Sequence, residues 1–283
     1  MSLASLPVGV FDSGLGGLTA VRRIKALLPH EDIIYFGDTG RLPYGTRSPK
    51  IICEYASDDM TFLSSFHVKA VCIACGTVSS TALPTLRERF DMPLIGVVEP
   101  AAGAAVRATK NGRIGVLATP STTRSEAFVR AVKAAKVDAE VMGVGCPMFV
   151  PLVENGYIAK DDPVTRIIAR EYVSKLKAFA PDVIILGCTH YPIIRPLIEE
   201  AAEEILGGVT VIDSGAAAAD MLKTYLAEND LLRTEGGGSA SFYVSDDPDG
   251  FERVASLFLG ENIEGASRID IGAYRYQPGK ETK

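Results

Sequence analysis

Two cysteines have the side-chain type and the sequence setting expected of acid–base groups in an active site. Cys75 lies in the tetrapeptide Ala-Cys-Gly-Thr, and Cys188 lies in Gly-Cys-Thr-His. Each follows an apolar run typical of a buried parallel strand, residues 70–73 before Cys75 and 183–186 before Cys188, and each precedes a segment with helical spacing. Open α/β sheets bind ligands at the carboxyl ends of their strands, so the two turns predict an active site with paired thiols.

The chemistry that two such thiols suggest is proton transfer at carbon. A helix that begins at the turn presents free N–H groups and a partial positive charge, which stabilise a thiolate and lower its pKa. A thiol and a thiolate on opposite sides of a carbon acid can protonate one face and deprotonate the other, which inverts the stereocentre. The ordinary cysteine pKa of about 8.5 makes both protonation states accessible. Because N–H donors and hydroxyls can stabilise the carbanion-like transition state, this hypothesis needs no cofactor and no metal.

The overall composition limits the class of protein. A chain of 283 residues is long enough for one large or two medium α/β domains. The net charge of −6 argues against a nucleic-acid or anionic-membrane partner, and no apolar run reaches membrane-spanning length. Five cysteines do not suggest a disulfide framework, and the first residues do not read as a secretory signal. We therefore expect a protein of the reducing cytoplasm.

Strand and helix patterns alternate along the chain, which predicts an α/β fold with doubly wound, mostly parallel sheets. The series that starts near residue 7 restarts near residue 113, with matching element types at each landmark. Chance similarity between two α/β runs is the alternative explanation. If the repeat is real, two pseudo-symmetric domains face each other across an active-site cleft. We predict that residues 1–98 plus 210–283 form the first domain and residues 99–209 the second.

The glycine-rich turn after the first predicted strand does not favour a dinucleotide site. Residues 12–17 read Asp-Ser-Gly-Leu-Gly-Gly, which lacks the third glycine at the required spacing. The turn instead places Asp12 and Ser13 at a strand end beside a helix amino terminus. Cys146, which lies next to Pro147 in a predicted loop, has no assignment from the sequence.

Five motifs in combination resemble the glutamate racemases, over about residues 7–226. The resemblance implies two α/β domains and racemisation of L-glutamate to D-glutamate without a cofactor. It also implies the supply of D-glutamate for bacterial peptidoglycan, and a homodimer. The motifs are Phe-Asp-Ser-Gly-Leu-Gly-Gly at 11–17, Pro-Tyr-Gly at 43–45, Cys75-x-Thr77, Glu154-x-Gly156, and Gly-Cys-Thr-His-Tyr-Pro at 187–192.

The same resemblance implies the roles of individual residues. Cys75 and Cys188 would be the two acid–base thiols, with Asp12 assisting on the Cys75 side and Glu154 and His190 on the Cys188 side. Other residues would hold the amino acid through hydroxyl and backbone groups. These substrate-binding candidates are Asp12, Ser13, Tyr44, Gly45, Gly76, Thr77, Thr119, Thr122 and Thr189.

Gly76 departs from the family pattern, which has asparagine at this position. An asparagine amide can bond to a substrate carboxylate or ammonium, and glycine has no side chain to do so. Gly76 therefore keeps two alternatives open: an aspartate racemase with the same two-thiol mechanism, and a catalytically weakened homologue that binds an amino acid. A third hypothesis is a redox switch through a disulfide between Cys75 and Cys188.

Each candidate residue also has a purely structural interpretation. A single cysteine at a strand end is more often a small buried hydrophobe than a base. Asp12 has the residue type of a turn or helix cap. Glu154 has the character of a solvated loop charge, and His190 could cap a helix. The paired context of the cysteines favours the functional interpretation.

Overall fold

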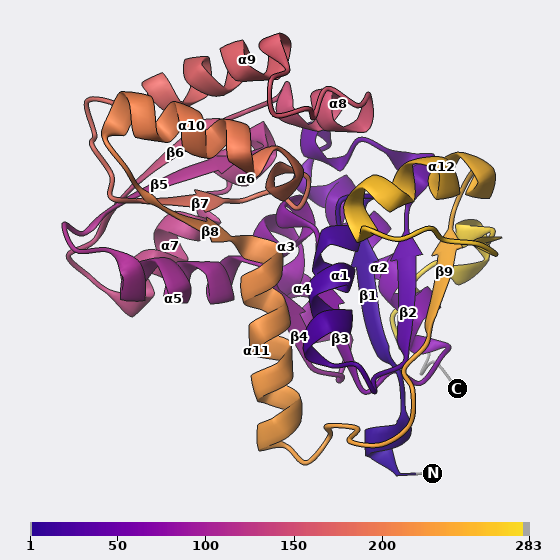
Figure 1. The fold of residues 1–283 in the computed structure, drawn as a ribbon. Coiled ribbons are helices and arrows are strands. Elements are labelled where there is room, and N and C mark those ends of the chain that lie inside the picture. The colour runs from indigo at the N-terminus through magenta and orange to yellow at the C-terminus, as the bar shows by residue number, and fades with distance from the viewer. Residues whose placement is uncertain (1, 280–283) are drawn as a thin grey trace.

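The computed structural model describes residues 2–279, which form two parallel α/β sheets with helices packed around them (Figure 1). The first sheet has the order β10-β9-β2-β1-β3-β4 and the second the order β6-β5-β7-β8. The first sheet consists of β1 (Val8–Asp12), β2 (Ile33–Gly37), β3 (Ala70–Ile73), β4 (Leu94–Gly96), β9 (Ala240–Val244) and β10 (Ser267–Arg268). The second consists of β5 (Arg113–Ala118), β6 (Glu140–Gly145), β7 (Val183–Leu186) and β8 (Thr210–Asp213).

Helices occupy most of the connections between strands. The α-helices around the first sheet are α1 (Leu18–Leu27), α2 (Pro49–Ser64), α3 (Gly76–Thr81), α4 (Leu83–Arg89) and α12 (Pro248–Leu259). Those around the second are α5 (Val98–Ala108), α6 (Pro120–Arg124), α7 (Ala127–Ala135), α8 (Phe149–Glu154), α9 (Pro163–Ser174) and α10 (Arg195–Leu206), and α11 (Ser214–Glu228) follows β8. Short 3₁₀ turns are η1 (Leu3–Ser5), η2 (Thr39–Arg41), η3 (Tyr44–Thr46), η4 (Tyr191–Ile194) and η5 (Ile271–Tyr274). No helix among residues 2–279 is both long enough and apolar enough to cross a membrane.

Four strands of the first sheet have the same order as the four strands of the second, and this correspondence is the repeat expected from the sequence. The core β2-β1-β3-β4 of the first sheet corresponds strand by strand to β6-β5-β7-β8 of the second. The prediction of a two-domain α/β fold with parallel sheets is confirmed. Cys75 and Cys188 follow β3 and β7, which are equivalent strands. Both strands are buried along their whole length, which explains their uninterrupted apolar runs.

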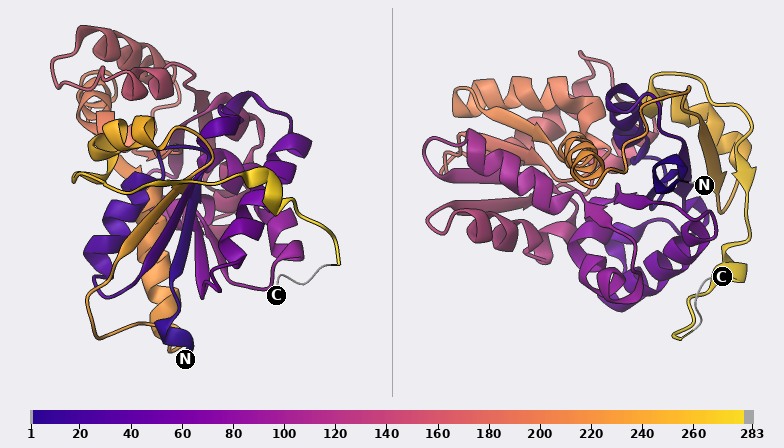
Figure 2. Two further views of the ribbon diagram at one scale, coloured as in Figure 1. Left: turned by 90° about the vertical axis from the view of Figure 1, so that its right-hand side faces the viewer. Right: turned by 90° about the horizontal axis from the view of Figure 1, so that it is seen from below.

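The chain returns to the first half later than the sequence analysis placed it. β8 pairs with β7 in the second sheet, so the segment 210–213 does not join the first sheet. The return begins with α11, which packs against α1 of the first half and α5 of the second. β9 and β10 then extend the first sheet beyond β2, and the carboxyl-terminal segment, residues 269–279, crosses from this edge and packs against α2 through η5 (Figure 2).

An aromatic cluster attaches this carboxyl-terminal segment to the first sheet. The ring of Phe62 on α2 lies 5.0 Å from Phe36 of β2, 5.4 Å from Tyr243 of β9 and 5.0 Å from Tyr274 of η5, between ring centroids. Phe62 is almost completely buried. Such pairs add to the free energy gained by burying the rings, so Phe62 joins three segments that are distant in sequence.

We predict that Phe62→Ala lowers the free energy of unfolding by about 3–5 kcal/mol, because it leaves a cavity between α2 and the carboxyl-terminal segment. Chemical denaturation measures the change. The control is Ile167→Ala on α9, whose side chain is 65% exposed, with an expected change within about 0.5 kcal/mol. A Phe62→Ala protein as stable as the control would contradict the role of the cluster.

Candidate active site

A cavity of about 440 Å³ lies between the two halves. The loops that follow β1, β2 and β3 contribute one wall, and those that follow β5, β6 and β7 contribute the other. It is therefore at the carboxyl ends of the strands, where parallel sheets bind ligands. The predicted site residues that line it are Asp12, Ser13, Tyr44, Gly45, Cys75, Gly76, Thr77, Thr119, Glu154, Cys188, Thr189 and His190.

Cys75 caps the amino terminus of α3, with its Sγ 3.5 Å from the hydroxyl oxygen of Ser13. Burial raises the pKa of the Cys75 thiol to about 12, and the negative charge of Asp12 contributes in the same direction. Hydrogen bonds from Ser13 and from the backbone of Val78 oppose this effect without cancelling it. The pKa of Cys75 therefore shifts upward, opposite to the direction expected from the helix terminus, because desolvation of the buried thiolate is the largest contribution.

Cys188 lies beside a histidine–glutamate pair. His190 Nδ1 is 3.8 Å from Cys188 Sγ, and His190 Nε2 is 2.9 Å from Glu154 Oε1. Burial lowers the pKa of His190, but hydrogen bonds with Cys188 and Glu154 outweigh burial and raise this pKa to about 10. His190 is thus an imidazolium at neutral pH, and it donates a hydrogen bond to the Glu154 carboxylate. Glu154 is a member of this ion pair rather than a solvated loop charge.

Asp12 joins the two halves inside the site. Its Oδ2 accepts a hydrogen bond from the Gly14 N–H at 2.9 Å, and its Oδ1 accepts one from the Thr189 hydroxyl at 3.4 Å. The side chain is almost fully buried, and burial raises its pKa despite the opposing charge of His190. Asp12 is therefore a turn residue, as its type suggested, and it also lines the cavity.

Glycines allow the two halves to approach each other closely around the cavity. A Cβ added to Gly16 would lie 2.3 Å from His190 Nδ1, and one added to Gly76 would lie 2.3 Å from the Gly187 carbonyl oxygen. Both distances are too short for non-bonded atoms. An asparagine in place of Gly76 would thus require the backbone of the Cys188 turn to move. The absence of a side chain at Gly76 therefore permits the close approach of the two cysteine turns.

Two predicted substrate contacts differ from expectation. The Tyr44 hydroxyl does not serve the cavity, because it is bonded to Asp38 and Asp59 behind the wall, so only the ring and backbone of Tyr44 are available. Thr122 does not line the cavity. Its N–H donates to the Thr119 hydroxyl oxygen at 3.3 Å, and its own hydroxyl lies 3.0 Å from that oxygen. Thr122 therefore supports Thr119 from behind.

Sequence reasoning missed the part of the wall that follows β6. Cys146, Pro147, Val150 and Pro151 line the cavity there. The available signal was topological, because this segment is the counterpart of the loop that follows β2 and carries Tyr44. Among the described residues no group of three or more His, Cys, Asp or Glu is placed to hold a metal ion.

Comparison with known proteins identifies the class of protein that this fold and cavity define. The glutamate racemase of Geobacter metallireducens is 40% identical over 267 residues, covering 94% of this chain and 97% of that protein. The glutamate racemase of Chlorobaculum tepidum is 42% identical over 268 residues, covering 94% of this chain and 96% of that protein. The solved glutamate racemase of Francisella tularensis in complex with D-glutamate has a TM-score of 0.88 and 36% identity, covering 96% of this chain and 100% of that one. The fold and the cavity are those of a two-domain racemase, an isomerase.

A family model described as Asp/Glu/hydantoin racemase matches residues 19–222. The chain belongs to this family.

The pKa of His190 leads to a prediction for solution NMR. With three histidines in the chain, we expect one imidazole to titrate near pH 10 in the folded protein, and Glu154→Gln to lower its midpoint. Since the folded-state pKa exceeds the unfolded value of about 6.5, these interactions stabilise the fold fully below about pH 6.5, and the stabilisation is lost as the pH rises through about 10. Glu199→Gln, on an exposed ion pair with Arg195, is the control. A His190 midpoint between pH 6 and 7 would contradict the pair.

The close approach at Gly76 leads to a second prediction. Gly76→Ala should destabilise the protein by about 1–3 kcal/mol and reduce racemase activity, since the added methyl group meets backbone that cannot rotate away. Gly103→Ala on α5 is the control, because its Cβ would meet only the Arg107 guanidinium, at 3.4 Å. Chemical denaturation measures the stability of both variants, and a turnover assay measures their racemase activity. Equal stability of Gly76→Ala and the unmodified protein would show that the turns do not meet as described.

Proposed function

We propose that the protein interconverts L- and D-glutamate by proton transfer at Cα, with Cys75 and Cys188 as the two acid–base thiols. The observation that carries the proposal is the placement of these two cysteines, one from each half and each after an equivalent strand, around a single cavity. The relatives named glutamate racemases, one of them solved with D-glutamate, support glutamate as the substrate.

The mechanism that we propose needs one thiolate and one thiol, which share a single proton. One thiolate removes the Cα proton, the electron pair stays on the carbanion-like centre, and the opposite thiol donates its proton to the other face. The reverse reaction exchanges the two roles. Asp12 and Ser13 lie on the Cys75 side, while His190 and Glu154 lie on the Cys188 side. The imidazolium of His190 lies beside Cys188, and its positive charge stabilises the thiolate form of that cysteine.

The remaining contacts in the proposal hold the charged groups of the amino acid. The residues available for this are Thr77, Thr119, Thr189, Gly45 and Gly76, which line the cavity. An ammonium group beside Asp12 would offset the negative charge that raises the Cys75 pKa. Substrate binding would then bring this thiol closer to the pH range in which it can act as a base.

Further parts of the proposal rest on family membership. We propose that the reaction needs no cofactor, supplies D-glutamate for bacterial peptidoglycan in the cytoplasm, and is carried out by a homodimer. We also propose two domains, with residues 99–213 as the second and the flanking segments as the first. This division assigns β8 to the sheet in which it pairs.

A second candidate function is the racemisation of aspartate by the same two thiols. The observation that keeps it open is Gly76, which has no side chain to contact the substrate and no room for one beside Gly187. Turnover of L-aspartate and L-glutamate side by side separates the two candidates.

The test is incubation with L-glutamate in D₂O without any cofactor, followed by proton NMR and circular dichroism. We expect the newly formed D-glutamate to carry deuterium at Cα while the remaining L-glutamate still carries protium, because separate thiols act on the two faces. Cys75→Ala and Cys188→Ala should each lower turnover by about 10²- to 10⁴-fold. Racemisation that survives in either variant would overturn the two-thiol mechanism. If folded, reduced protein exchanges the Cα proton of neither L-glutamate nor L-aspartate, a homologue that binds an amino acid without racemising it would be favoured.

A further inference from the structure

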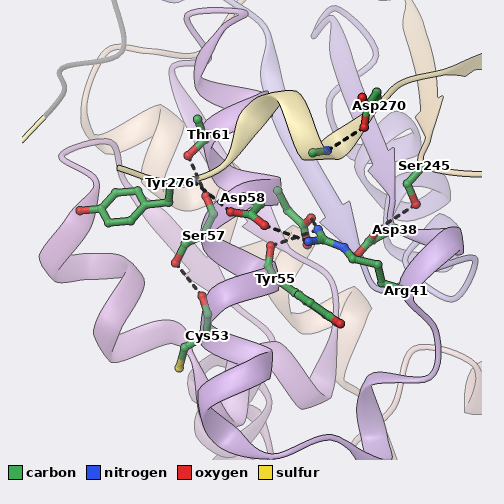
Figure 3. Close-up of polar contacts among 12 residues, drawn as sticks. Asp38, Arg41, Cys53, Tyr55, Ser57, Asp58, Thr61, Ser245, Asp270 and Tyr276 are labelled. Atoms are coloured by element: carbon green, nitrogen blue, oxygen red, sulfur yellow. Dashed lines mark hydrogen bonds and ion pairs between the residues drawn. The ribbon is translucent and has the colours of Figure 1, made fainter. Parts of the chain in front are cut away.

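A buried ionic cluster lies behind the wall of the cavity and meets the site described above at Tyr44. Its members are Asp38, Arg41, Tyr44, Asp58 and Asp59. Arg41 is at its centre: Nε is 2.6 Å from Asp38 Oδ2, Nη1 is 2.9 Å from Asp58 Oδ2, and Nη2 is 2.6 Å from Asp59 Oδ1. Figure 3 shows the Arg41 side chain reaching between Asp38 and Asp58. The side chains of Asp38 and Asp59 have no exposed surface, so three carboxyl groups share one guanidinium.

The hydrogen bonds of Asp38 are those of an acceptor. Its Oδ2 accepts from Arg41 Nε and from the Tyr44 hydroxyl. Its Oδ1 accepts from the Ser245 hydroxyl at 2.7 Å, and the Ser245 oxygen itself accepts from the Gly40 N–H at 2.8 Å. Arg41 Nε is an obligate donor to Asp38, and the Ser245 hydroxyl, which already accepts from Gly40, is placed to donate its own proton to Oδ1.

Asp58 also accepts at both oxygens. Its Oδ2 receives Arg41 Nη1 at 2.9 Å, and its Oδ1 receives the backbone N–H of Tyr276 at 3.0 Å. The second bond joins the carboxyl-terminal segment to the cluster. With Asp38 and Asp58 both ionised, the charge of Arg41 is already exceeded before Asp59 is counted.

Asp59 differs from the other two carboxyl groups. Its Oδ1 accepts from Arg41 Nη2, and its Oδ2 lies 3.1 Å from the Tyr44 hydroxyl oxygen. Tyr44 has a single hydroxyl proton, and its oxygen faces both Asp38 and Asp59, so two hydrogen bonds at these contacts require one more proton. Asp38 also accepts from Arg41 and Ser245, whereas the other donor to Asp59 is Arg41, so the geometry favours Asp59 as the group that carries this proton and Asp38 as the acceptor of the Tyr44 proton. Burial raises the pKa of Asp59 well above its usual value, and the charges of Asp38 and Asp58 raise it further while Arg41 and Tyr44 oppose them.

We propose that Asp59 is a neutral carboxylic acid that donates a hydrogen bond to Tyr44 Oη and so positions the cavity wall formed by residues 43–45. Asp59 is a positioning residue, because it reaches the cavity only through Tyr44. The part of this proposal that concerns turnover rests on the proposed function. The protonation state of Asp59 does not, and it can be measured without substrate.

The first test compares Asp59→Asn with Asp58→Asn, the same isosteric change at adjacent positions of α2. Asparagine at 59 keeps an oxygen for Arg41 and presents an N–H to Tyr44 Oη, so kcat/KM should stay within about threefold of the unmodified enzyme. Asp59→Leu removes the donor and should raise KM about tenfold with a smaller change in kcat. Asp58→Asn turns an amide N–H toward one of the two donors at this position, Arg41 Nη1 or the Tyr276 N–H, and should therefore lower the melting temperature. A kcat/KM for Asp59→Asn that falls as far as that for Asp59→Leu would overturn the proposal.

The second test measures the proton directly in the protein without substrate. In infrared difference spectra at neutral pH, the unmodified protein should show the C=O stretch of a protonated carboxyl group that Asp59→Asn lacks and Asp58→Asn retains. The melting temperature of Asp59→Asn relative to the unmodified protein should also rise with pH above about 4. The reason is that only the unmodified protein must keep a proton that its unfolded chain releases. A missing carboxyl band, or a flat or falling difference in melting temperature, would show that Asp59 is ionised.

Discussion

The contact on which the site depends is the one between Gly16 of the first half and the His190 ring of the second. No side chain separates them, because a Cβ at this position would occupy the same space as the imidazole. The hydroxyl of Thr19, three residues further on, donates to the Thr189 carbonyl oxygen at 2.9 Å. The beginning of α1 is thus joined to the turn that carries Cys188, and the glycine-rich sequence serves this packing rather than a nucleotide.

The two thiols have opposite electrostatic neighbours. Cys75 lies near the buried carboxylate of Asp12, and Cys188 lies near the imidazolium of His190. The first arrangement favours a neutral thiol, whereas the second places a cation beside sulfur. A reaction that runs in both directions needs one protonated and one deprotonated thiol at a time. The asymmetry of the charged neighbours is a physical basis for that division, within a fold whose two halves share the same order of four core strands.

The sequence predicted the parts of the structure that short-range patterns determine. Buried parallel strands produce apolar runs, so the strands before Cys75 and Cys188 and the turns after them could be placed. The boundary at residue 210 could not, because β8 has the same local pattern whichever sheet it joins. The raised pKa of Cys75 reflects burial in the folded cavity, and Asp59 is one polar residue within the amphipathic helix α2. Such properties come from contacts between distant segments, which no local pattern records.

The proposed mechanism requires the two thiols to lie on opposite faces of one bound amino acid. A crystal structure of the reduced protein with D-glutamate would show whether they do. We predict the amino acid in the cavity between the halves, with its Cα between Cys75 Sγ and Cys188 Sγ and its ammonium group near Asp12. D-glutamate bound with both sulfurs on one side of Cα, or bound outside this cavity, would contradict the account.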